Sequence, residues 1–120
     1  MKIEVSNGEI VDKLTILEIK KDNSEGEKLK NIMEELNYLK PIVAELNIPI
    51  SIVNQLREVN KNLWDVEDML RDCEREQTFD QHFITLARAV YHTNGARFKL
   101  KTEINKITGS HFVEEKIHPE

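Results

Sequence analysis

Apolar residues recur along this chain at alternating spacings of three and four, which is the period of amphipathic α-helices. The longest unbroken series lies between residues 52 and 73 and consists of Ile52, Leu56, Val59, Leu63, Val66, Leu70 and Cys73. A sustained seven-residue repeat is typical of helices that pack nearly antiparallel at shallow crossing angles. The pattern predicts an all-α fold, an antiparallel helical bundle of about four helices, with a short extended arm at residues 1–5.

Helix starts are marked by a serine or threonine followed three residues later by Glu or Gln, the capping-box pattern. The pattern occurs at Ser6, Ser24 and Thr78. A turn at Pro49 followed by Ser51 marks a fourth start. These signals predict a single domain, 1–120, with helices at about 7–21, 25–46, 51–76 and 79–108 and a tail at 110–120.

Two positions interrupt the periodic pattern. Proline inside a helix removes a backbone donor and clashes with the preceding turn, so Pro41 predicts a kink or a restart in the second helix. Asn94-Gly95 is a turn dipeptide in many contexts. The apolar pattern resumes in phase after it, however, which favours one continuous fourth helix.

Composition narrows the classes of partner. The chain has 120 residues and a net charge of −5, and no block of Lys and Arg that would bind nucleic acid or an anionic membrane. No apolar run approaches the 18 or so residues of a membrane span, and the N-terminus lacks the apolar segment of a secretory signal. A single cysteine, Cys73, continues the apolar series, which indicates a buried small hydrophobe. We therefore expect a cytoplasmic protein with no nucleic-acid and no membrane partner.

Several polar residues fall on helix faces that are otherwise apolar, or at their borders. They are Glu18 on the first helix, Asn60 and Glu67 on the third, and Asn94, Arg97, Lys101 and Asn105 on the fourth. An unpaired charge in a helical core costs several kcal/mol, so the two cations need anionic partners. Glu18, Glu67 and Glu74 are the acidic residues that these faces offer.

Two interpretations of these polar residues stay open. One is an internal salt-bridge network that fixes how the helices align. The other is a polar cavity between helices in which Arg97 and Lys101 bind an anionic ligand, such as a phosphorylated or carboxylated metabolite. The four histidines have no metal-ligand spacing, and we find no phosphate loop or nucleophile motif, so the sequence names no cofactor, predicts no metal and leaves enzymatic activity undecided.

The first predicted helix is apolar on two sides. Leu14 and Leu17 form one stripe, and Ile16 and Ile19 lie opposite. A helix of this kind is buried on two sides, inside a bundle or against a second subunit. We therefore favour an accessory or interaction protein that acts as a homodimer. The alternatives are a small all-α enzyme or ligand-binding protein and a protein that binds another helix.

Three stretches together carry a family resemblance: VSNGEIVDKLTILEIK at 5–20, LWDVEDMLRDCE at 63–74 and FITLARAVYHTNGARFKLKTEIN at 83–105. In this order they resemble an uncharacterised family of small bacterial and phage proteins that are often encoded near genes for cell-surface glycan or glycosyltransferase functions. The resemblance implies a setting in surface-polysaccharide metabolism and does not imply a reaction.

Overall fold

A computed structural model describes residues 1–118, and these residues form four α-helices and no strand. The helices are α1 (Asn7–Asp22), α2 (Gly26–Glu45), α3 (Ile50–Glu76) and α4 (Gln81–Thr108). An extended arm precedes α1, and an irregular tail follows α4. The predicted all-α helical bundle is thus confirmed.

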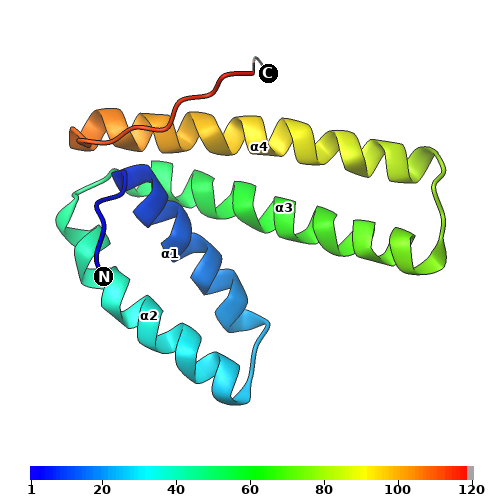
Figure 1. The fold of residues 1–120 in the computed structure, drawn as a ribbon, viewed down its shortest axis with the longest axis horizontal. Coiled ribbons are helices and arrows are strands. Elements are labelled where there is room, and N and C mark those ends of the chain that lie inside the picture. The colour runs from blue at the N-terminus through cyan, green and yellow to red at the C-terminus, as the bar shows by residue number, and fades with distance from the viewer. Residues whose placement is uncertain (119–120) are drawn as a thin grey trace.

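The helices are arranged as two antiparallel pairs, α1 with α2 and α3 with α4 (Figure 1). The α1–α2 pair crosses the longer α3–α4 pair obliquely near one end of it. The α1 helix packs against each of the other three helices. The far part of the α3–α4 pair, residues 64–76 and 81–93, extends beyond α1 and is called the distal hairpin below.

The core lies where the two pairs meet. Val11 of α1 packs with Val53 and Leu56 of α3 and Ile104 of α4, all buried. A second cluster joins two buried α1 leucines to Leu36 of α2. The Leu14 and Leu17 side of α1 is therefore covered by α2 within one chain, whereas Ile16 on the opposite side is only half-buried.

The start signals had mixed outcomes. The Ser6 cap is confirmed, because its hydroxyl accepts a hydrogen bond from the Glu9 amide at 3.3 Å. The Ser24 cap is wrong: α2 begins at Gly26, and its N-cap residue is Glu25. The Thr78 cap is also wrong, since Asp80 caps α4 through the Phe83 amide.

Thr78 misled the prediction because it belongs to the end of the preceding helix. Its amide donates to the Cys73 carbonyl at 2.9 Å, after Gln77 has turned the chain with a φ of 54°. These contacts close the last turn of α3. One residue, Phe79, then separates Thr78 from Asp80, the N-cap of α4.

The interruptions do not break the helices. The α2 helix runs through Pro41 without a restart, and α4 is continuous through Asn94-Gly95 as expected. The α3 helix begins after Pro49, slightly earlier than the Ser51 signal suggests. Cys73 is buried, as its place in the apolar series predicts.

Candidate functional site

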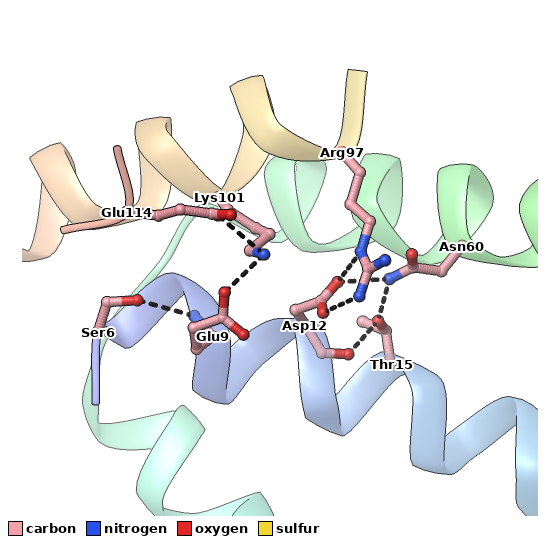
Figure 2. Close-up of polar contacts among 8 residues, drawn as sticks. All are labelled: Ser6, Glu9, Asp12, Thr15, Asn60, Arg97, Lys101 and Glu114. Carbon is pink, nitrogen blue, oxygen red and sulfur yellow. Dashed lines mark hydrogen bonds and ion pairs between the residues drawn. The ribbon is translucent and has the colours of Figure 1, made fainter. Parts of the chain in front are cut away.

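A carboxylate of α1 forms the centre of a polar cluster between the two helix pairs. Both oxygens of Asp12 accept hydrogen bonds from Arg97 of α4, at 2.9 Å from Nε and 2.5 Å from Nη2 (Figure 2). The Asp12 side chain is only 4% exposed, whereas that of Arg97 is 26% exposed. A two-point guanidinium–carboxylate contact fixes orientation as well as charge. The pair therefore locks α1 onto α4 in one alignment.

The third helix joins the same cluster through an amide. Asn60 Nδ2 donates to Asp12 Oδ1 at 2.9 Å and to Thr15 Oγ1 at 2.8 Å. The Thr15 hydroxyl in turn donates to the Asp12 carbonyl at 2.8 Å. Asn60 and Thr15 are both buried. Three helices thus meet at one carboxylate.

One turn further along α4, a buried lysine binds two carboxylates from different segments. Lys101 Nζ lies 2.6 Å from Glu9 Oε1 of α1 and 3.0 Å from Glu114 Oε1 of the C-terminal tail (Figure 2). The lysine side chain is 9% exposed, while the two glutamates are nearly half exposed. The ion pairs therefore attach both α1 and the tail to α4.

The first turn of α1 has its free amides bonded by the end of α4 and the residues after it. Gly8 N donates to Asn105 Oδ1 at 2.7 Å, and Asn7 N donates to Ser110 Oγ at 3.0 Å. With the Ser6 cap on the Glu9 amide, three successive N–H groups are satisfied. Asn105 thus acts as a tertiary cap for the first turn of α1, through a contact with Gly8 that spans 97 residues.

The same contact requires a glycine. A Cβ atom placed on Gly8 would lie 2.6 Å from the Lys101 backbone oxygen and 3.1 Å from Asn105 Oδ1. Such a distance to a backbone atom cannot be relieved by a side-chain rotation. The absence of a side chain at Gly8 therefore sets how closely α1 and α4 approach.

The charges in the cluster are stabilised by their partners. Burial by itself would raise the pKa of the Asp12 carboxyl, but hydrogen bonds from Arg97 and Asn60 outweigh it and hold the pKa below the ordinary 3.8. Burial would likewise lower the pKa of Lys101, and the hydrogen bonds to Glu9 and Glu114 raise it above 10.5 overall. Both groups are ionised at neutral pH.

Comparison with known proteins adds a family and no activity. A family of unknown function, DUF6165, has a model that matches residues 1–119. The chain belongs to this family. No curated protein and no solved structure matches it. The expectation of an uncharacterised family is met, and the family description contains no statement about genomic setting.

Four of the predicted site residues in this family member lie along one line of contact with α1. Asn60 and Arg97 share Asp12, while Lys101 and Asn105 hold the first turn of the helix. The prediction of Glu18, Glu67 and Glu74 as partners for the cations is wrong. The carboxylates that bind Arg97 and Lys101 come from Asp12, Glu9 and Glu114.

The remaining predicted residues lie around this line. Glu18 forms an ion pair with Arg57 of α3 at 3.1 Å. Glu67 is half-buried and lines a small groove beside Asn60 and Arg97. Asn94 is exposed and lines a hollow beside the C-terminal tail.

Sequence reasoning missed Asp12, although the chain contains a signal for it. Gly8, Asp12, Thr15 and Ile19 follow one another at spacings of four, three and four, so they share one side of α1. A small residue and a buried isoleucine at the two ends of this line mark a contact face. Polar residues at its centre should then meet polar partners.

The cluster is built to hold helices together. Asp12 accepts hydrogen bonds from Arg97 and Asn60, and Thr15 is bonded to Asn60 and to the Asp12 carbonyl, so these contacts join three helices. Among residues 1–118 no group of three or more His, Cys, Asp or Glu is placed to hold a metal ion. Within that same range no helix is long and apolar enough to cross a membrane. Of the two sequence interpretations, these contacts favour the structural network for the inner face.

Proposed function

We propose that the protein is an interaction protein that acts as a homodimer, and that the two copies meet through their distal hairpins. The observation that carries this proposal is the mismatch in length between α1, with 16 residues, and the 27 and 28 residues of α3 and α4. The α1 helix covers only the near part of the longer pair (Figure 1). The same helix faces continue beyond it without a third helix.

Seven-residue steps identify the face in question. On α4, Arg97 faces α1, and Val90 and Phe83 lie one and two heptads away on the same side. On α3, Asn60 faces α1, and Glu67 lies one heptad further. We call the side of the distal hairpin that bears Phe83, Val90 and Glu67 the distal face. Its apolar residues are half-buried, in contrast to the fully buried core.

The distal face begins in a groove at the point where α1 diverges from the hairpin. Ile16 and Ile19 of α1 and Leu63 and Trp64 of α3 line this groove, which has a volume of about 180 Å³. Ile16 and Trp64 are only half-buried. Apolar walls next to exposed aromatic surface are typical of protein contacts. A further helical element would complete this packing.

A second copy of the chain fits because the charges on α3 are self-complementary. Glu67 and Arg71 lie one turn apart and project toward the same side of the helix. If the two-fold axis that relates two copies passes between these two residues, Glu67 of each copy lies opposite Arg71 of the other. Isologous contacts of this kind are the commonest in soluble oligomers. The two hairpins would then form an intermolecular four-helix bundle.

Light scattering after size separation tests the dimer. The wild-type protein is expected at twice the chain mass of 14.0 kDa. Arg71→Glu should shift the mass toward the monomer because it places like charges opposite each other across the axis. The combined Glu67→Arg and Arg71→Glu variant should restore the dimer, since the pairing is then reversed in both copies.

Lys61→Glu serves as the matched control. Lys61 is an exposed cation of α3 with an intrahelical aspartate partner, as Arg71 is, but it lies about 80° around the helix from Arg71 and outside the distal hairpin. It should leave the mass unchanged. A wild-type mass of one chain at all concentrations would contradict the proposal, and so would a dimer that the Arg71→Glu change does not affect.

The setting of this dimer is proposed from the sequence. A net charge of −5 supports protein partners over nucleic acid or anionic membranes, and a cytoplasmic location follows from the same composition. The family resemblance suggests an accessory role in surface-polysaccharide metabolism. Deletion of the gene should then change the surface polysaccharide of the cell, and an unaltered polysaccharide would contradict that role.

A further inference from the structure

A polar hollow of about 230 Å³ lies between α4 and the C-terminal tail. Its charged and polar lining consists of Asn94, Arg97 and Lys101 from the helix and Glu114, Glu115 and Lys116 from the tail. The hollow lies outside the distal hairpin contact, so the inference drawn from it is independent of the proposed dimer.

Lys101 has more carboxylate contacts than its charge requires. Glu9 of α1 already balances the ammonium at 2.6 Å, and Arg97 is balanced separately by Asp12. Glu114 adds a second carboxylate at 3.0 Å, from a segment outside the helices (Figure 2). The tail therefore places a second carboxylate against a buried ammonium that Glu9 already contacts.

We propose that this position is a binding site for a phosphoryl group, which Glu114 occupies in the absence of ligand. A single Glu114 oxygen contacts Lys101, whereas Asn94 and Lys116 line the same hollow with additional N–H donors. A phosphoryl group has three acceptor oxygens and carries more charge than one carboxylate. It can therefore accept from Lys101, Lys116 and Asn94 together.

The docked tail could release Glu114 so that a phosphoryl group takes its place. Residues 111–118 are exposed and irregular, and Glu114 is 42% exposed although it contacts a buried lysine. In the adjoining hollow, which Glu114 and Glu115 also line, the hydroxyl of Thr102 is buried without a hydrogen-bond partner among the described residues. Displacement of Glu114 by a ligand would not break the helix–helix contacts of Glu9 or Asp12.

Titration with inorganic phosphate at constant ionic strength, followed by amide chemical shifts, tests the site. Glu114→Gln should bind phosphate at least about tenfold more tightly than the wild type, because the competing carboxylate is held at high effective concentration by the chain. The largest shifts are expected at Asn94, Lys101 and Lys116. Adding Lys116→Met to the Glu114→Gln variant should reverse most of the gain.

Glu115→Gln is the matched control, because it removes the same charge from the same hollow without freeing Lys101. Equal affinity of the two single variants for phosphate would overturn the proposal, and so would shifts confined to other residues. Methyl phosphate in a parallel titration distinguishes the source of the group. Tighter binding of the ester than of the free ion indicates a phosphorylated ligand, and the reverse indicates inorganic phosphate.

Discussion

The near and distal halves of the α3–α4 pair differ in what their shared face contacts. In the near half, Asn60 and Arg97 both donate hydrogen bonds to a carboxylate of α1. In the distal half, the equivalent heptad positions are Glu67, Val90 and Phe83. Glu67 lines a groove with Ile16 and Ile19 of α1, and the α3–α4 pair then continues beyond α1 (Figure 1). The shared face of α3 and α4 changes from a polar network to a mostly apolar surface near the point where α1 ends.

This difference indicates that the near half supplies the stability of the fold and the distal half is available for contact. A buried network with few unsatisfied atoms specifies one arrangement of helices. A two-helix hairpin with half-buried apolar residues has only one partner for each helix. Substitutions in the two halves should therefore have different consequences, in the order of decreasing effect given below.

The largest effect is expected from breaking the central ion pair. Arg97→Met leaves the Asp12 carboxylate buried and without its cation, which should lower the free energy of unfolding by about 3–5 kcal/mol. Combining it with Asp12→Leu should recover most of that loss, because no charge then remains buried. Urea unfolding of the four proteins in this cycle measures the coupling. Additive losses would contradict a direct pairing.

One alanine substitution in each half sharpens the comparison. Ile104→Ala, at a position that is 0% exposed in the near core, should cost about 2–5 kcal/mol through the cavity it leaves. Val90→Ala removes a half-buried side chain of the distal face, so it should cost about 1 kcal/mol at protein concentrations that keep the chain monomeric. Similar losses at both sites would show that the distal half is as well packed as the near half.

Gly8→Ala separates tertiary packing from helix propensity. Helix propensity alone favours alanine by about 1 kcal/mol. The close approach to the Lys101 backbone predicts the opposite sign, a loss of about 1–3 kcal/mol from overpacking. Thermal unfolding beside Asn31→Ala, an exposed position of α2, provides the measurement and its control. A stabilised Gly8→Ala protein would disprove the contact.

The smallest effect of the series is a loss of unfolding free energy in acid, which does not appear at neutral pH. Because the pKa of Asp12 is lowered in the folded chain, its contribution is complete above the unfolded value of about 3.9 and is lost as the pH falls through the folded value. The Asp12→Leu/Arg97→Met protein lacks this group. Its unfolding free energy should therefore fall less steeply than that of the wild type below about pH 4, and parallel curves would contradict the assignment.

The helical pattern predicted the elements better than the contacts between them. Heptad series and the Ser6 cap placed the helices, because periodicity and capping are local properties of the chain. The predicted start of α4 at Thr78 was wrong because the Thr78 amide bonds to the last turn of α3. Which helix end a loop residue serves depends on the tertiary structure and not on the local sequence. The sequence pattern does not report the oblique crossing of the two pairs.

The sequence predicted the residues that α3 and α4 contribute to the candidate site, but not the carboxylate that α1 contributes. Face analysis selected Arg97 because its heptad neighbours are apolar, and it selected Asn60 because that residue lies beside the apolar stripe of the third helix or at its border. It did not select Asp12, because helical periodicity gives the direction of a side chain and not the helix that lies opposite. The partner became evident only when α1 was placed across α4. Long-range pairs of this kind, 85 residues apart, depend on tertiary structure.

Amide hydrogen exchange at low and high protein concentration tests the central claim most directly, because it reports both whether the copies associate and where. The near half should be protected at every concentration, since its packing is complete within one chain. Residues 64–76 and 81–93 should exchange fast in dilute protein and become protected as the concentration rises. Fast exchange of the distal hairpin at all concentrations would contradict the account.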